Sequence, residues 1–114
     1  MADCLFCKIV AGQIPASLVF QNDHVVAFKD TTPRAPTHML IVPRRHIATL
    51  NDLAPEDDAL VGEMIRAAAM LAKQQGLDER GYRTVFNCNA DAGQTVFHIH
   101  LHLLGGRPMT WPPG

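Results

Sequence analysis

The sequence has no long apolar run, no excess of charge of either sign and no repeat or biased tract. Ten Lys and Arg residues nearly balance eleven Asp and Glu residues, which leaves a formal net charge of −1. Sequence-independent binding to a nucleic acid needs a basic surface, so we expect no nucleic-acid partner. No uncharged apolar stretch approaches the roughly 20 residues that span a bilayer, so we expect no membrane span. A chain of 114 residues without a linker is predicted to be a single domain, 1–114.

Cysteines are few, and their number is odd. The N-terminus carries Asp3 and no apolar signal-like run, so we expect a cytoplasmic protein rather than a secreted one. In a reducing compartment the C-x-x-C pair Cys4 and Cys7 indicates a metal or redox pair and not a disulfide. Cys88 lies in an apolar strand-like run and is predicted to be a core residue.

The element pattern predicts an α+β fold with a five-stranded antiparallel sheet, one long helix and a short N-terminal helix. The short helix covers 4–11 and ends at Gly12, and the long helix runs from Pro55 to Gly76. The predicted strands are 18–21 and 25–29, which form a hairpin, followed by 38–43, 82–87 and 97–104. Apolar residues recur at helical spacing in the long helix, and we expect them to pack on the sheet. They are Leu60, Val61, Met64, Ile65, Ala68, Leu71 and Ala72.

Histidine is the residue type in excess, with six in the chain and three of them within 98–102. Because alternate strand residues share a face, His98, His100 and His102 should line one side at spacings of about 7 Å, while Ile99 and Leu101 enter the core. Such a row fits a zinc centre on three histidines, or an imidazole nucleophile whose neighbours manage protons. The preceding loop, 92–95, combines a glycine with amide and hydroxyl groups that suit phosphoryl oxygens, which favours phosphoryl chemistry.

The segment 98–104, His-Ile-His-Leu-His-Leu-Leu, resembles the histidine-triad (HIT) motif of nucleotide hydrolases and transferases. The stretches 5–9, 28–30, 35–38 and 42–46, with Asn87 and the ending 104–114, are similar to the Hint branch, the histidine-triad nucleotide-binding proteins. This resemblance implies a homodimer whose two sheets join into one. It also implies hydrolysis of purine nucleoside phosphoramidates, such as adenosine 5′-phosphoramidate, with no cofactor required. Two alternatives stay open: a regulatory or scaffold protein with vestigial hydrolysis, and a dinucleoside polyphosphate hydrolase.

The resemblance also assigns roles to single residues. His100 would attack the α-phosphorus, His102 would contact the phosphate, and His38 would lie behind the triad as a relay. Asp30 would accept both ribose hydroxyls, with Thr31 at the ribose edge. Gly93, Gln94 and Thr95 would bind phosphate oxygens or pass a proton to the departing amine, which makes Thr95 a candidate catalytic residue. Asn87 and Val96 would complete the phosphate or sugar side of the site. The base slot, whose residues could equally be plain core, would be formed by Leu5, Phe6, Ile9, Phe28 and Leu40. Trp111 would reach toward the partner subunit's site.

A possible structural zinc site follows from a departure from the Hint pattern. The Cys4 and Cys7 pair resembles that of zinc-binding HIT proteins, where such a pair joins the His of an Arg-His sequence and the first triad His. The set here would be Cys4, Cys7, His46 and His98, a closed tetrahedral Cys₂His₂ site. The alternative is that both cysteines are packing residues and His46 is a surface group. His24, at a turn, is expected to be exposed and inert.

Overall fold

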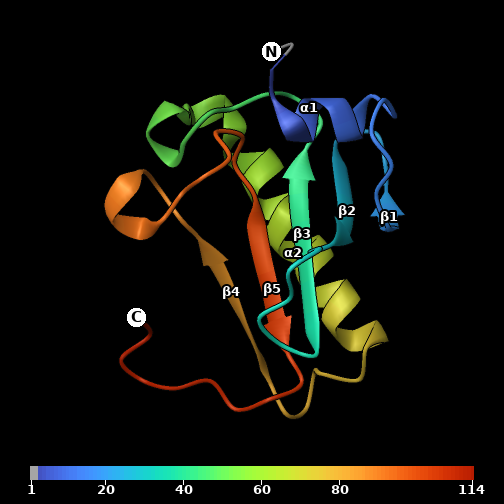
Figure 1. Ribbon diagram of the computed structural model, residues 1–114, viewed down its shortest axis with the longest axis vertical. Coiled ribbons are helices and arrows are strands. Elements are labelled where there is room, and N and C mark those ends of the chain that lie inside the picture. Colours follow the sequence, from blue (N-terminus) through green and yellow to red (C-terminus); the bar gives the residue numbers. More distant parts are fainter. Residues whose placement is uncertain (1–2) are drawn as a thin grey trace.

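The computed structural model describes residues 3–114 and contains one five-stranded antiparallel sheet of strand order β1-β2-β3-β5-β4 (Figure 1). The strands are β1 Leu18–Gln21, β2 Val25–Lys29, β3 Thr37–Pro43, β4 Tyr82–Phe86 and β5 Leu101–Gly105. The helices are α1 Leu5–Val10 and α2 Asp58–Gln74, with short 3-10 turns at Leu50–Asp52, Pro55–Asp57 and Ala90–Ala92. The predicted fold class and order of elements are therefore confirmed.

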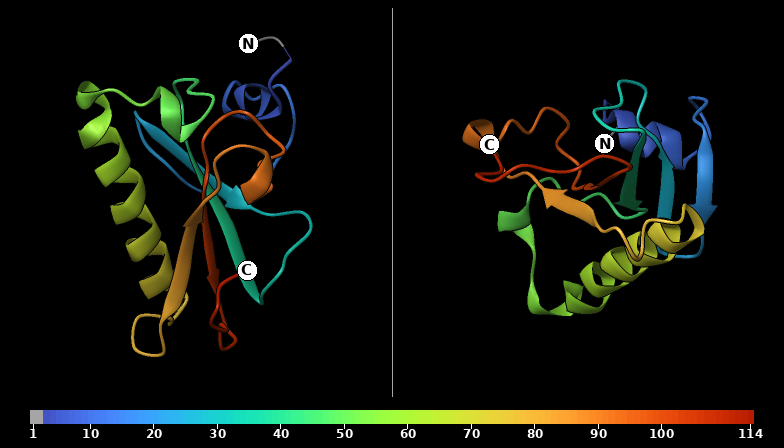
Figure 2. Two further views of the ribbon diagram at one scale, coloured as in Figure 1. Left: turned by 90° about the vertical axis from the view of Figure 1, so that its left-hand side faces the viewer. Right: turned by 90° about the horizontal axis from the view of Figure 1, so that it is seen from below.

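The two helices lie on opposite faces of the sheet (Figure 2). One core lies between the sheet and α2 and includes Met39, Ile41 and Leu101. The other lies beneath α1 and is formed by Phe6, Val26, Phe28, Leu40 and Val42. Strands β2 and β3 are thus covered on both sides, which explains why they are nearly continuous apolar runs in the sequence. Among the described residues, no helix has the length and apolar character to cross a membrane.

The predicted β1–β2 hairpin is present, although its turn lacks glycine. Asn22 supplies the turn geometry, since its Oδ1 accepts hydrogen bonds from the backbone N–H groups of His24 and Val25, both at 2.9 Å. An Asn side chain that bonds its own backbone two residues on is a common way to close such a turn.

Helix α2 begins at Asp58, three residues later than the sequence predicts, because Pro55–Asp57 forms a 3-10 turn. Asp57 holds this turn, since its Oδ2 accepts from the backbone N–H of Ala54 at 2.8 Å. The apolar face packs on the sheet as predicted, with Met64 and Leu71 fully buried. Ile65 was predicted to belong to that face and is 51% exposed, so this assignment is wrong. The buried stripe passes through Met64 and Ala68, and Ile65 lies beside it.

Two predictions about the second half of the sheet are also wrong. The last strand was expected over 97–104, but β5 begins only at Leu101. The chain leaves the ladder there because the N–H of Ile99 donates to the carbonyl of Ile47, beyond the end of β3. Cys88 was expected in the core, but it follows the end of β4 in a loop and is only half-buried.

Candidate active site and metal cluster

A cavity of about 440 Å³ lies on the α1 face of the sheet. Helix α1 and strands β2, β3 and β5 supply its walls, so residues far apart in sequence meet there. It brings together most of the side chains that the resemblance assigned to a nucleotide. The lining includes Leu5, Phe6, Ile9, Phe28, Asp30, Thr31, Leu40, Thr95, Val96, His100 and His102.

His100 has one ring nitrogen fixed by the backbone and the other open to the cavity. Its Nδ1 lies 2.8 Å from the carbonyl oxygen of His98. A carbonyl only accepts, so Nδ1 carries the proton and Nε2 of the neutral ring keeps its lone pair. Nε2 makes no hydrogen bond within residues 3–114. Every buried side-chain nitrogen or oxygen in this range has a hydrogen-bond partner, so Nε2 cannot be one of the buried atoms. Nε2 is therefore accessible from the cavity, although the residue as a whole is only 8% exposed.

His102 is oriented by a chain of hydrogen bonds that begins at the backbone. The N–H of Arg34 donates to Nδ1 of His38 at 3.0 Å, so the proton of His38 is on Nε2. That Nε2 lies 2.9 Å from Nδ1 of His102 and donates to it. His102 is thereby left with its proton on Nε2. The site therefore holds an imidazole lone pair on His100 next to an imidazole N–H donor on His102, with ring centroids 5.0 Å apart.

All four histidines of this face favour the neutral form. Burial lowers the pKa of His38, of His98 and of His100 below the usual value for histidine. Burial, together with the neighbouring His100 and His38, lowers the pKa of His102 to about 4. A neutral imidazole is the form that can act as a nucleophile or as a metal ligand, so the site is ready for either at neutral pH.

Asp30 lies at the mouth of the cavity and is partly engaged by its own turn. Its Oδ1 accepts from the N–H and the hydroxyl of Thr32, at 2.8 and 3.1 Å. Its Oδ2 lies 3.4 Å from Nε2 of His38. A carboxylate offers about four acceptor positions, so Asp30 retains capacity for ligand hydroxyls while it supports the histidine chain.

Gln94 does not contribute its side chain to the cavity. It is 6% exposed, and its Oε1 accepts from the N–H of Asn89 at 2.8 Å. Its Nε2 donates to the carbonyls of Ala48 and Val96, at 2.8 and 3.1 Å. The amide is fully used in tying the loop 89–96 to the rest of the fold. The structure therefore corrects the expected phosphate contact of this side chain to a loop-holding role. Neither Asn87 nor Gly93 lines the cavity.

Phe6 links the cavity wall to the triad. It is buried, and its ring meets that of His100 edge to face, with centroids 5.0 Å apart and planes at 85°. It makes similar contacts with His98 at 6.0 Å and with Phe28 at 5.4 Å. Edge-to-face pairs of this kind add about 0.5–1.5 kcal/mol to the burial of the ring.

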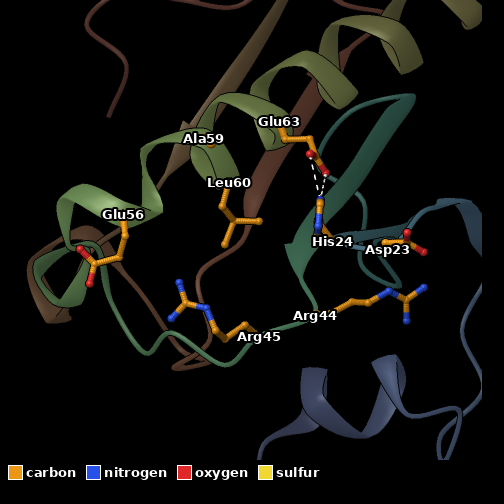
Figure 3. Close-up of a pocket in the computed structure, with 8 residues that line it drawn as sticks. All are labelled: Asp23, His24, Arg44, Arg45, Glu56, Ala59, Leu60 and Glu63. Atoms are coloured by element: carbon orange, nitrogen blue, oxygen red, sulfur yellow. Dashed lines mark hydrogen bonds and ion pairs between the residues drawn. The ribbon is translucent and has the colours of Figure 1, made fainter.

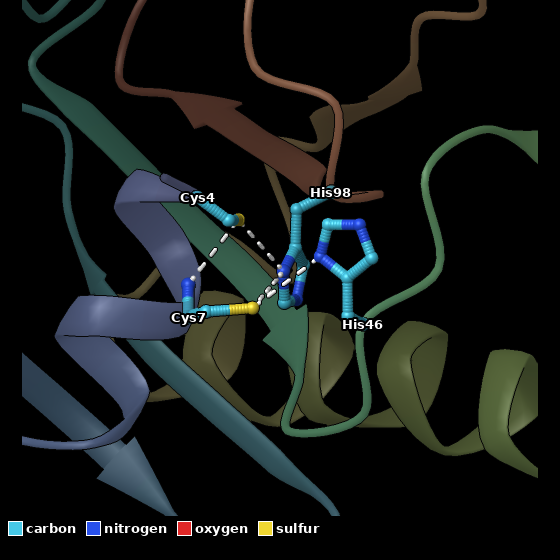
Figure 4. A group of neighbouring side chains, drawn as sticks. All are labelled: Cys4, Cys7, His46 and His98. Carbon is cyan, nitrogen blue, oxygen red and sulfur yellow. Dashed lines mark hydrogen bonds between the residues drawn. The ribbon is translucent and has the colours of Figure 1, made fainter. Parts of the chain in front are cut away.

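Cys4, Cys7, His46 and His98 converge at the N-terminus of α1, with their ligand atoms within 4.8 Å of one another (Figure 4). Nδ1 of His98 lies 3.4 Å from Sγ of Cys4 and 3.5 Å from Sγ of Cys7, and Nδ1 of His46 lies 3.3 Å from Sγ of Cys7. In a tetrahedral zinc site the bonded sulfur and nitrogen atoms are about 3.5 Å apart. The donor set and its spacing therefore fit zinc.

Hydrogen bonding outside the cluster supports the same reading of His98. Its Nε2 lies 2.8 Å from the carbonyl of Pro43 and donates to it, so the lone pair is on Nδ1, toward the cysteines. Burial and the adjacent Cys4 raise the pKa of the Cys7 thiol, so metal binding must displace a proton there.

A zinc centre on all three triad histidines is not compatible with this geometry. Within residues 3–114, His98, His100 and His102 do not bring their ring nitrogens together as metal ligands. Nδ1 of His98 faces the cysteines, and Nδ1 of His100 is bonded to the carbonyl of His98. Asp30, His38 and His102 do lie within reach of one another. However, Nε2 of His38 already carries the proton that it donates to His102, so it has no lone pair to offer a metal.

A second cavity, of about 420 Å³, lies between the β1–β2 turn and the start of α2 (Figure 3). Several of its side chains are already engaged: His24 lies 3.1 Å from Glu63, Arg44 donates to the carbonyl of Asn22, and Arg45 pairs with the buried Asp57. His24 is exposed, as expected. Its one histidine, His24, is exposed and lies against Glu63, whereas His100 is buried and has a free ring nitrogen. The second cavity is therefore not the candidate active site.

The sequence reasoning missed one part of the cavity wall, the connection from α1 to β1. Ile14, Pro15, Ala16 and Ser17 all line the cavity. Ser17 is fixed there because its carbonyl accepts from the N–H of Lys29 at 3.0 Å. No motif indicates this segment, and the only signal was its position directly after a short helix closed by Gly12.

The fold and the site define a sheet protein with a histidine row over an apolar slot, and comparison with known proteins gives its family. The family model "HIT domain" matches residues 11–109, so the chain belongs to the HIT domain family, as the motif indicated.

Its relatives include solved structures. The chain is 49% identical to the purine nucleoside phosphoramidase of Escherichia coli strain K12 over 107 residues. The aligned region covers 94% of this chain and 90% of that protein. It is similar to a HIT family hydrolase from Legionella pneumophila, at 56% identity and a TM-score of 0.97, over 98% of this chain and 100% of that one. A histidine triad protein from Clostridium difficile is 39% identical with a TM-score of 0.93, over 96% of both chains.

Proposed function

We propose that the chain is a nucleotide hydrolase that cleaves purine nucleoside 5′-phosphoramidates through a nucleotidyl-histidine intermediate on His100. Membership of the HIT family and the relative named purine nucleoside phosphoramidase support a hydrolase of this class. The observation that carries the proposal is the hydrogen bond from Nδ1 of His100 to the carbonyl of His98, which leaves Nε2 unprotonated and facing the cavity.

In the first step Nε2 of His100 attacks the α-phosphorus, and the P–N bond breaks. The departing nitrogen takes one proton from the solvent and leaves as the amine, and the attacking water returns that proton in the second step. The positive charge that develops on the ring of His100 is stabilised by the carbonyl that accepts from Nδ1. The Nε2–H group of His102 donates to a phosphoryl oxygen, and His38 holds that donor in place.

In the second step water attacks the nucleotidyl-histidine, the N–P bond breaks, and the nucleoside monophosphate leaves. The two steps together consume one water and release one amine, so His100 is regenerated. Thr95, at the open rim of the cavity, is the hydroxyl that we place next to the leaving group. Covalent catalysis of this kind replaces one difficult displacement by two easier ones.

The apolar part of the cavity supports a substrate that carries a planar base in addition to the phosphoryl group at His100. Phe6, Ile9, Phe28 and Leu40 form the apolar lining of the cavity, and Asp30 lines the same cavity with its Oδ2 3.4 Å from Nε2 of His38. A base in the slot would place the ribose at Asp30 and Thr31 and the α-phosphate at His100 and His102. Positioning by remote contacts is what aligns the phosphorus for attack.

We propose further that zinc binds at Cys4, Cys7, His46 and His98 as a structural metal. When bound, zinc would cross-link α1, the segment after β3 and the segment before β5. The four protein ligands would close the coordination shell, which is typical of structural sites and leaves catalysis to His100. The support is the donor set, the sulfur–nitrogen spacing and the fixed proton position of His98.

A homodimer joined at the sheet edge is also a proposal. Strand β4 is at the edge of the sheet, and an uncovered edge favours pairing with another chain. Trp111 is 82% exposed, as a residue that reaches a partner would be. Sedimentation of the purified protein would show a dimer if the proposal holds and a monomer if it does not.

We also propose a cytoplasmic, reducing setting. The support is that Cys4 and Cys7 are free thiols that lie together with two histidines in a group able to hold a metal.

The function is tested by turnover of three substrates: adenosine phosphoramidate, guanosine phosphoramidate and a diadenosine polyphosphate. We expect both phosphoramidates to be hydrolysed and the dinucleotide to be a poor substrate. The variant His100→Ala should keep purine nucleotide binding and lose turnover. Cleavage of the dinucleotide alone, or near wild-type turnover by His100→Ala, would refute the proposal.

A further inference from the structure

Three arginines line a single cavity at the end of the sheet that lies farthest from α1. The cavity has a volume of about 260 Å³ and is lined by Arg80, Arg83 and Arg107 together with Gly81, Tyr82 and Pro108, among others. Its residues come from the turn that leads into β4 and from the segment that follows β5, at the bottom of Figure 1, whereas α1 is at the top. We call this the arginine cavity.

Within residues 3–114 no carboxylate forms an ion pair with these arginines. The ion pairs within residues 3–114 are His24 with Glu63, His38 with Asp30, and Arg45 with Asp57. Neither the arginine cavity nor the smaller cavity that adjoins it has an acidic residue in its lining. The chain as a whole has a net charge of −1, so three positive charges in one cavity are a local excess. The three guanidinium groups repel one another there. A bound anion would relieve that repulsion.

Two of the guanidinium groups are already held in place. Arg107 donates from Nε to the carbonyl of Arg34 at 3.0 Å and from Nη1 to that of Pro108 at 3.1 Å. Arg83 donates from Nη2 to the carbonyl of Thr110 at 3.0 Å. Each guanidinium has five N–H donors, so both retain donors for a ligand. Arg80 makes no hydrogen bond or ion pair with any of residues 3–114 and is exposed.

We propose that the arginine cavity is a binding site for a small oligophosphate, separate from the histidine site. The planar guanidinium fork matches phosphoryl oxygens in bidentate pairs, and all three cations are arginines. Three cations suit an anion with more than one phosphoryl group. Arg107 and Arg83 form the fixed part of the site, and Arg80 closes on the ligand. The site does not depend on the activity proposed for His100. Arg80 and Arg107 lie outside β4, whereas Arg83 is on β4, the edge strand of the proposed dimer.

The test is a titration of the full-length protein with inorganic pyrophosphate, followed by the amide signals of Gly81 and Gly106 in ¹⁵N-labelled protein. Sodium sulfate at matched ionic strength is the control for general screening. We expect saturable shifts at these two glycines with pyrophosphate, and small, unsaturated ones with sulfate. ATP, titrated separately, shows whether the triphosphate tail of a nucleotide is also accepted: shifts at the glycines assign the tail to this site, and their absence restricts it to free oligophosphate.

Variants separate the proposed site from an ion atmosphere. Arg80→Gln removes no contact within residues 3–114, so it should fold normally and raise the Kd for pyrophosphate about tenfold, as expected for one lost charge-assisted hydrogen bond. Arg66→Gln, on the exposed side of α2, is the matched control and should leave the Kd unchanged. Equal Kd values for wild type and Arg80→Gln would overturn the proposal, as would equal shifts with sulfate or shifts confined to the histidine site.

Discussion

His38 and His102 share a hydrogen bond of 2.9 Å between Nε2 and Nδ1, and the backbone N–H of Arg34 decides which of the two donates. The proton position of His102 is thus set from a loop outside the sheet. We expect His38→Ala to lower kcat through misorientation of His102, with a smaller effect on KM. Steady-state kinetics on adenosine phosphoramidate measure this, and the exposed His24→Ala should be indistinguishable from wild type. A change in KM alone would contradict the assigned role.

The lowered pKa of His102, about 4, predicts acid sensitivity of the fold. Above pH 6.5 the ring is neutral in both folded and unfolded chains, so its contribution to stability is fully present there. Between pH 6.5 and about 4 the unfolded chain binds a proton that the folded chain does not. The free energy of unfolding therefore falls as the pH falls, by less than about 1.4 kcal/mol per pH unit for this group.

Denaturant unfolding at several pH values between 7 and 4 measures the slope. His102→Gln should flatten it, whereas His24→Gln, which alters an exposed residue, should not. An unchanged slope for His102→Gln would show that the ring titrates normally in the folded chain.

Phe6 should connect the metal cluster to the base slot, because it lies between Cys4 and Cys7 and contacts the ring of His100. Phe6→Leu keeps an apolar side chain but loses the edge-to-face pairs. We expect a loss of about 1–2 kcal/mol of stability and a raised KM for the nucleotide. The exposed Phe97→Leu is the control. Wild-type stability and KM for Phe6→Leu would show that these ring contacts contribute nothing.

Removal of the metal should lower the stability of the fold first, and hydrolysis should be lost only as the protein unfolds. We expect about one zinc per chain by elemental analysis, and a slow loss of activity with chelator that follows unfolding. Cys4→Ser should lose both the metal and several degrees of Tm, since four-ligand sites contribute folding energy. Cys88→Ser, in a loop away from the cluster, should retain the metal. Instant inhibition by chelator without a change in Tm would indicate a catalytic metal instead.

Gln94 should matter for the loop and not through direct contact with phosphate. Gln94→Ala removes three hydrogen bonds from a buried amide, and we expect a loss of about 1–3 kcal/mol. Thermal unfolding measures it, with the exposed Gln13→Ala as the control. If Gln94→Ala weakened phosphate binding without any loss of stability, the side chain would have the role that the sequence predicted.

The sequence could predict the face that the histidines share, because alternation is a property of extended backbone. Ile99, Leu101 and Leu103 do enter the α2 core, opposite His98, His100 and His102. It could not predict that the regular strand begins only at Leu101, because this depends on a hydrogen bond from Ile99 to Ile47, far away in the chain.

The four residues of the cysteine–histidine cluster could also be predicted from the sequence, whereas the hydrogen bonds of Gln94 could not. Cysteine spacing and the resemblance indicated the four cluster residues, and the fold brings them together. The motif loop gave no sign that the amide of Gln94 faces inward, since its partners are backbone groups of Asn89, Ala48 and Val96. Backbone partners carry no residue-specific signal, so only the folded structure can assign them.

In the proposed mechanism, Nε2 of His100 becomes bonded to the nucleotide phosphorus during turnover. The most direct measurement is rapid quenching of the protein with adenosine phosphoramidate, followed by mass spectrometry of the peptide that contains His100. We expect a transient peptide that carries one adenosine monophosphoryl group on His100 and is absent from His100→Ala. Turnover without any adduct, or an adduct on another residue, would contradict it.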